Sequence, residues 1–130
     1  MKRFLLVFWV LGMLAPMAWL AHFIPGYERI FNFIFGPPWM HWVSHALLFA
    51  VLCFLLLWLW GDKELTWQRV LGVLLLVLLA IFLQEKIQLW YKARAWGADE
   101  WFDAGVDMMG ALAGAGVWWL VVKLHLTQSH

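Results

Sequence analysis

In 130 residues, 65% of them hydrophobic and only 13% charged, this chain is too apolar for a water-soluble domain, in which about 25% of residues are charged. Its nine basic and eight acidic side chains leave a net charge of +1. Because such a balance lacks the basic surface that nucleic acids require, we expect no nucleic-acid partner. The composition instead predicts one integral membrane domain over residues 1–130.

Four apolar stretches are each close to the length of about 20 residues that a helix needs to cross the hydrocarbon core of a bilayer. The first follows Met-Lys-Arg, as in a secretory signal, but the residues before Ala18 and Ala21 fit the small-residue cleavage rule poorly, so we expect this stretch to be retained. Pro16 should kink it. The pattern predicts an all-α integral membrane four-helix bundle with spans at residues 4–24, 39–60, 65–84 and 104–122.

A short mixed segment separates the first two predicted spans. A Pro-Gly pair ends the first span, and Gly-Pro-Pro precedes the second. The segment between them, Tyr27–Phe35, has an amphipathic composition that is typical of a helix lying flat in the membrane interface. Its polar residues are Glu28, Arg29 and Asn32.

The basic residues predict the orientation. Lys2 and Arg3 precede the first span, which usually dominates topology, and basic residues favour the cytoplasmic side. We therefore predict that both termini lie on the cytoplasmic side of the membrane (N-in/C-in). The five inner basic residues are then Lys2, Arg3, Lys63, Arg69 and Lys123, and the four outer ones are Arg29, Lys86, Lys92 and Arg94.

The chain has twelve tryptophans, and most of them lie near the ends of the predicted spans. An indole ring at that depth buries its apolar body and keeps its N–H in contact with water. The positions therefore predict an interfacial belt, with packing against pigments, quinones or sterols as the alternative.

Polar residues gather on one side of the predicted membrane. Because successive spans alternate in direction, the connections after the first and third spans reach the same face. A charged group within a bilayer needs a partner or a water-filled pocket, so we expect the function to reside there. The residues at this face are Glu28, Glu85, Asp99, Glu100, Asp103 and Asp107, with His22, His41 and His45.

Helical spacing places several of these side chains on common faces. Residues three or four apart lie above one another on a helix, as do His41 with His45, Glu85 with Gln88, and Asp103 with Asp107. We expect Arg94 to be the counter-charge of Glu85 or Asp107. The candidate binding cluster is His45, Glu85, Gln88, Arg94, Asp103 and Asp107.

Two glycines continue the acidic stripe of the last span. Gly110 and Gly114 form a G-x-x-x-G, a spacing that lets two helix backbones approach closely. We expect them to pack against neighbours within the chain, and contact with another subunit is the alternative.

The cluster resembles motifs of the VanZ-like membrane protein family. In that family a histidine is followed four residues later by an aromatic at the start of a span, as His45 is by Phe49 here. A later Glu-x-x-Gln precedes an arginine nine residues after the glutamate, which matches Glu85, Gln88 and Arg94.

A third family motif matches the stripe Asp103–Gly114, with Asp107 in place of an asparagine. The chain departs from the family at His41 and Trp42, where members usually carry Asp-Lys. The loss of that lysine and the exchange of asparagine for Asp107 make the cluster more acidic here. The resemblance implies a four-helix fold in the inner (cytoplasmic) membrane of a bacterium and an association with low-level teicoplanin resistance, and it supplies no settled chemistry for these residues.

The first functional interpretation is non-catalytic. The cluster would be a polar clasp at the outer ends of the last three spans, in an accessory protein or small subunit of a larger membrane or envelope complex. Its expected partners are membrane lipids and other membrane protein subunits. No cofactor is predicted beyond bound lipid.

Two alternatives stay open. An envelope enzyme would act on a lipid-linked substrate in one of two ways. His41 and His45, with Asp103, Asp107 or Glu85 nearby, would bind a divalent metal that activates water, although no metal site is predicted; or Glu85 and His45 would act as a metal-free acid–base pair. A subunit of a pigment- or haem-bearing electron-transfer or photosynthetic complex would use His22, His45 or His125 as an axial ligand.

Overall fold

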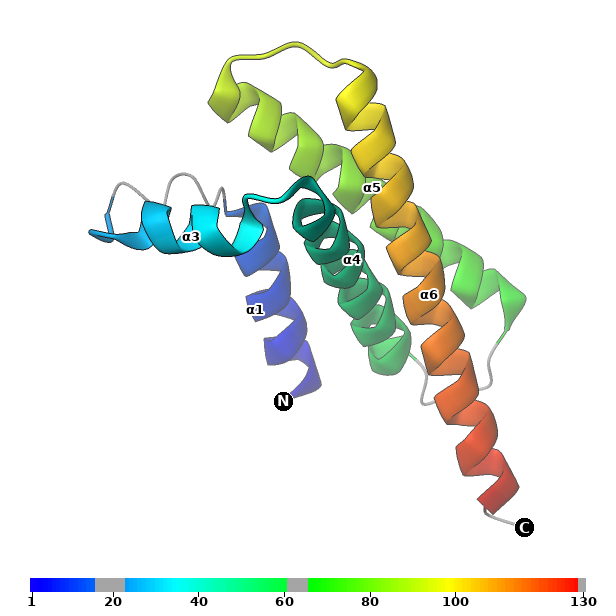
Figure 1. The fold of residues 1–130 in the computed structure, drawn as a ribbon. Helices are drawn as coiled ribbons and strands as arrows, with labels where there is room; N and C mark the ends of the chain where they lie inside the picture. The colour runs from blue at the N-terminus through cyan, green and yellow to red at the C-terminus, as the bar shows by residue number, and fades with distance from the viewer. Residues whose placement is uncertain (16–22, 61–65, 129–130) are drawn as a thin grey trace.

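The structure, a computed structural model, describes residues 1–15, 23–60 and 66–128. Every regular element in this part of the chain is an α-helix, so the all-α prediction is confirmed for it. The helices, labelled in Figure 1, are α1 (Lys2–Leu14), α3 (Tyr27–Phe35), α4 (Pro38–Trp60), α5 (Trp67–Lys92) and α6 (Ala98–Gln128).

Three of the described helices are long and apolar enough to cross a membrane: α4, α5 and the part of α6 that covers Ala98–His125. Helix α4 follows the predicted second span closely, and it begins at Pro38 because the fixed φ of proline suits a first helical turn, where its missing N–H is not needed. These helices support a membrane location for the chain.

Helices α5 and α6 are longer than the apolar stretches that predicted them. Helix α5 continues from the stretch 65–84 to Lys92, because the polar residues after Gln84 favour helix and only the apolar centre marks a span. The helix ends where Ala93 takes a left-handed conformation with φ of 50°, and Arg94 N–H donates to the Leu89 carbonyl at 3.1 Å. Such a left-handed residue satisfies the last carbonyls of a helix.

The connection between α5 and α6 is shorter than the gap between the third and fourth predicted spans. It occupies residues 93–97, and α6 begins at Ala98. The Glu100 Oε2 atom accepts a hydrogen bond of 2.8 Å from the Gly97 N–H, which caps the first turn of α6, where acidic side chains also oppose the positive end of the helix dipole. Asp99, Glu100 and Asp103 are therefore helical.

The first predicted span is only partly within the described residues. Helix α1 ends at Leu14, and Pro16 lies outside the described part of the chain. Helix α1 packs against α4 and α5, and the Trp9 indole N–H donates to the Leu48 carbonyl of α4 at 3.0 Å. The beginning of the chain therefore belongs to the same bundle as the long helices.

Helix α3 extends across the ends of α1 and α4 instead of running beside them (Figure 1). It starts after Gly26, whose φ of 80° is easily adopted only by glycine, and it contacts α4. Ile30 and Phe33 remain exposed on it. The helix predicted here is confirmed, and its place in a membrane interface stays a prediction.

Helices α4 and α6 run side by side in the same direction (Figure 1) and form the most extensive contact between helices. The contact is close because glycines of α6 face alanines of α4, and neither residue has a large side chain. A Cβ atom added to Gly110 would overlap the Ala46 backbone, and one added to Gly114 would overlap the Ala50 backbone. The two glycines therefore pack within the chain.

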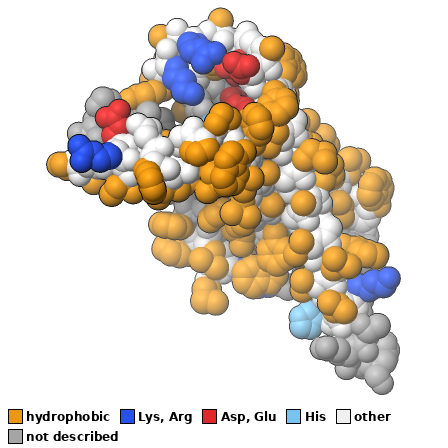
Figure 2. Space-filling model, viewed as in Figure 1, with side chains coloured by type: hydrophobic (Ala, Val, Ile, Leu, Met, Phe, Trp, Pro, Cys, Tyr) orange, Lys and Arg blue, Asp and Glu red, His pale blue; other side chains and the backbone are white. Residues whose placement is uncertain are grey.

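The core below this contact is apolar. Its fully buried side chains include Phe49, Leu52, Cys53, Val73 and Val77. The outer surface is apolar as well: in Figure 2, hydrophobic side chains cover the middle of the visible face, and charged side chains lie toward its ends. A soluble protein rarely exposes so large an apolar surface, so this distribution agrees with lipid as the surroundings.

Candidate functional site

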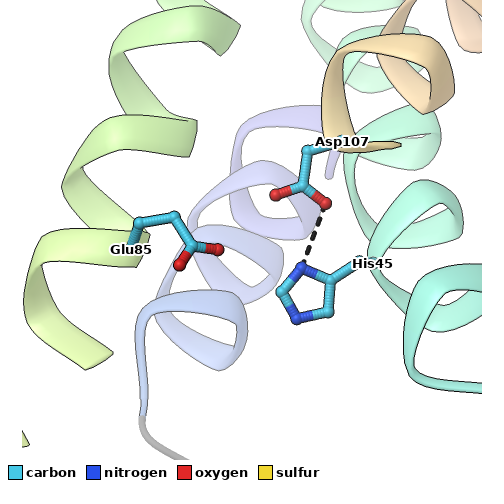
Figure 3. A group of neighbouring side chains, drawn as sticks. All are labelled: His45, Glu85 and Asp107. Carbon is cyan, nitrogen blue, oxygen red and sulfur yellow. Dashed lines mark hydrogen bonds and ion pairs between the residues drawn. The ribbon is translucent and has the colours of Figure 1, made fainter. Parts of the chain in front are cut away.

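Three polar side chains from three long helices meet inside the bundle. His45 comes from α4, Glu85 from α5 and Asp107 from α6, and their exposed fractions are 6%, 3% and 0%. Figure 3 shows the Glu85 carboxylate pointing toward the His45 ring and the Asp107 carboxylate. The parallel approach of α4 and α6 makes this possible, since Asp107 lies about one turn from Gly110 on the helix.

The pair of His45 and Asp107, which we call the inner rung, is hydrogen bonded. The Nδ1 atom of His45 lies 3.0 Å from Oδ1 of Asp107, so the ring N–H donates to the carboxylate. One carboxylate oxygen of Glu85 lies within 4.8 Å of a ring nitrogen of His45 and of a carboxylate oxygen of Asp107. The inner rung thus joins α4 to α6, and Glu85 brings α5 to the same point.

A second pair lies one turn nearer to the beginning of both helices. The Nε2 atom of His41 is 3.6 Å from Oδ2 of Asp103, and these side chains are 43% and 21% exposed. The rings of His41 and His45 are 4.4 Å apart between centroids. This outer rung connects the buried inner rung with the end of the bundle.

Several buried oxygens in this region have no hydrogen-bond partner among the described residues. They include Oε1 of Glu85 and Oδ2 of Asp107, both next to the inner rung, and Oε1 of Gln84. Buried polar atoms are usually hydrogen bonded, so each of these is an exception that calls for a partner. Gln84 was missed by the sequence analysis, and a polar residue at the end of an apolar span was the signal that could have found it.

Arg94 does not pair with Glu85 or Asp107 as expected. Its guanidinium Nη2 lies 3.7 Å from Glu100 and 4.0 Å from Asp99. The expectation is wrong because α6 begins at Ala98 and carries these two acids up to Arg94. Gln88 lies half-buried about one turn beyond Glu85 on α5.

Of the other histidines proposed as axial ligands, His125 lies apart from the cluster, and His22 is outside the described residues. His125 is exposed near the far end of α6, 18 residues from Asp107, which corresponds to about 27 Å along a helix. Of the two proposed axial ligands that the structure describes, His45 and His125, only His45 therefore belongs to the cluster.

The cluster can accept hydrogen bonds, exchange protons or bind a cation. Its two carboxylates are acceptors with free lone pairs, and the neutral imidazole offers one donor and one acceptor. Arg94 is engaged by Asp99 and Glu100, and His45, protons or a bound cation can balance the charge of Glu85 and Asp107.

Over the residues that the structure describes, the protein is helical, with three helices long and apolar enough to cross a membrane and a buried cluster of one histidine and two carboxylates between them. Comparison of the chain with protein-family models, with curated proteins and with solved structures finds no match. The likeness to VanZ-like proteins therefore rests on the motif residues alone.

Proposed function

We propose that the chain is a VanZ-like integral membrane protein of the bacterial inner membrane and acts as a non-catalytic accessory or small subunit of a larger membrane or envelope complex. In this proposal the inner rung and Glu85 form a polar clasp that holds α4, α5 and α6 together. The observation that carries the proposal is the hydrogen bond between His45 and Asp107, two residues 62 apart in sequence, which is buried between α4 and α6.

The position of the motif residues supports the family part of the proposal. The three VanZ-like motifs are distant in sequence, and one residue from each of them, His45, Glu85 and Asp107, contributes a donor atom to a single cluster. A shared cluster is what a common structural or chemical role of the motifs requires.

The surface of the bundle supports a membrane topology with four spans and both termini inside. Helix α1 packs on α4 and α5, so a fourth span would join the same bundle. Lys2 lies 4.9 Å above the Trp58 ring, and Lys123 lies 4.8 Å above the Trp119 ring. Both pairs suit the interface at the end where the two termini lie in Figure 1.

The interior of the cluster favours a structural role because its three members come from three helices and His45 and Asp107 bridge two of them. A buried interhelical hydrogen bond in a membrane protein contributes about 0.6 kcal/mol on average and up to about 1.7 kcal/mol. For the clasp we expect a value near the upper end, because charge-assisted hydrogen bonds are about twice as strong as neutral ones.

A double-mutant cycle tests the clasp. We expect His45→Ala and Asp107→Ala to lower the free energy of unfolding by about 2 kcal/mol each, and the double variant to show a coupling energy of about 1.5 kcal/mol. Unfolding by SDS in mixed micelles measures these values. The exposed Asp99→Ala is the matched control, and a coupling energy near zero would contradict the clasp.

Co-purification tests the accessory role. The tagged chain is extracted gently from its native membrane, and bound proteins are identified by mass spectrometry with their stoichiometry. Other membrane subunits in a fixed ratio to this chain are the expected result. A chain that purifies alone, in a stable and fully extracted form, would argue against a subunit role.

An envelope enzyme is the second candidate. The buried oxygens of Glu85 and Asp107 that lack partners favour it, because groups poised for catalysis are often left incompletely paired in a resting site. Variants such as Glu85→Gln that remain fully stable and lose a measurable activity on a lipid-linked substrate would replace the clasp with this function.

A further inference from the structure

We propose that His45, Glu85 and Asp107 form a binding site for a divalent cation of the zinc type, with one imidazole nitrogen and one oxygen from each carboxylate as ligands. The inference goes beyond the clasp, which needs no cation. It also narrows the divalent-metal alternative considered from the sequence, because the structure groups His45, without His41, with two carboxylates from two other helices.

The spacing of the donor atoms suits such an ion. Tetrahedral Zn²⁺ with bonds of about 2.1 Å holds its ligands about 3.4 Å apart. The Nδ1–Oδ1 distance of the inner rung is 3.0 Å, which is close to one edge of that tetrahedron. Binding replaces this hydrogen bond with two bonds to the ion, and the Nδ1 proton leaves to solvent while Nε2 takes up a proton, so that the imidazole stays neutral. All three donor atoms lie within 4.8 Å of one another, so the ligands reach bonding distance by side-chain rotations that move them by about 1.4 Å or less.

The unpartnered oxygens supply an independent reason for a ligand. Glu85 Oε1 and Asp107 Oδ2 are shielded from solvent without a hydrogen-bond partner among the described residues, and both residues are more than nine-tenths buried. Figure 3 shows both carboxylates directed toward the same region beside the His45 ring. A cation bound there would bond to carboxylate oxygens that otherwise remain unsatisfied.

Charge and ligand type select the kind of cation. Two ionised carboxylates carry two negative charges, which a divalent cation balances. One imidazole with two carboxylates suits zinc or manganese, whereas calcium and magnesium prefer a shell of oxygens alone. Three protein ligands leave a fourth tetrahedral position for water or another small ligand, as in catalytic zinc sites.

The outer rung lies on the side of the site that is nearer to the helix ends. His41 and Asp103 are partly exposed, with their facing atoms 3.6 Å apart, and the rings of His41 and His45 are 4.4 Å apart between centroids. We therefore expect a cation to reach the inner rung from this side.

Cobalt and zinc titrations test the site. The full chain is purified without a polyhistidine tag, treated with a chelator and titrated with Co²⁺, whose visible absorption reports tetrahedral nitrogen and oxygen ligands. We expect one Co²⁺ per chain and its displacement by Zn²⁺. Binding of neither ion to the wild-type chain at millimolar concentration would overturn the proposal.

Variants separate this site from adventitious binding. We expect Glu85→Gln and Asp107→Asn to weaken Zn²⁺ binding by more than about 100-fold, because even residues that only orient metal ligands contribute 10–100-fold. The exposed Asp99→Asn, which removes one carboxylate elsewhere at the same end of the bundle, should bind as the wild type does. Equal binding by all three variants would mean an adventitious ion only.

The proposal can fail without the clasp failing, because the double-mutant cycle is measured on the metal-free protein. Folding of each variant is checked by its helical circular dichroism and elution volume. If a variant does not fold, X-ray absorption of the zinc-loaded wild type decides: one imidazole with oxygen ligands supports the site, and a thiolate or several imidazoles contradicts it.

Discussion

Two halves of the same three helices are built differently. At one end, His45, Glu85 and Asp107 are buried together and depend on directed hydrogen bonds. Toward the other end, the core consists of side chains such as Leu57 and Val73, which contact each other without any preferred direction. Inside a membrane, apolar burial drives helix association only weakly, because lipid is as apolar as leucine.

The polar end, more than the apolar half, specifies how the helices are arranged. Apolar side chains tolerate small shifts of one helix along another, since a similar contact is regained after the shift. A buried polar pair tolerates no such shift, because a misaligned partner leaves an unsatisfied group in a medium without water. The polar end therefore fixes the register of α4 against α6, and the apolar half fills the remaining volume.

The largest loss of stability is expected at Gly110, where α4 and α6 approach each other closely and both the polar end and the apolar half depend on this contact. Gly110→Ala places a Cβ atom against the Ala46 backbone, and neither helix can yield without losing the inner rung. We expect a loss of about 3 kcal/mol in the free energy of unfolding, measured by SDS denaturation. Gly105→Ala is the control, because a Cβ atom there meets nothing within 4 Å. Equal stability of the two variants would contradict the close contact.

A smaller loss of stability is expected from substitutions in the apolar half. Ile81 is fully buried, so Ile81→Val removes one methylene and should lower the free energy of unfolding by about 1 kcal/mol. Leu79 is 66% exposed on the same helix, and Leu79→Val should change it by less than about 0.5 kcal/mol. Both values come from the same denaturation assay. If the two variants lose equal stability, the assignment of the core on α5 is wrong.

The smallest change in stability is expected from the exposed ion pairs of Arg94. The Arg94 side chain is 56% exposed, with carboxylates 3.7 and 4.0 Å away, and such pairs contribute less than about 1 kcal/mol. We expect Arg94→Gln to change the free energy of unfolding by about 0.5 kcal/mol or less. A loss as large as that of Asp107→Ala would restore Arg94 as the counter-charge of the buried cluster.

The sequence located the long helices but not all of their ends. The apolar stretches located α4, α5 and α6, because about 20 consecutive apolar residues are rare outside membrane spans. They did not locate the ends of α5 and α6, which capping and a left-handed residue determine. Ala93 and the hydrogen bond from Gly97 to Glu100 shortened the connection and gave Arg94 different partners from those predicted.

The sequence by itself determined the helical class, the apolar spans and the polar residues that have to be shielded or paired, because composition and the helical period depend only on local residues. It also indicated Gly110 and Gly114 as a place of close packing. Only the tertiary structure decided which groups pair: His45 with Asp107, His41 with Asp103, and Glu85 beside the inner rung. Those pairs depend on the relative rotation and register of separate helices, and contacts between residues distant in sequence set both.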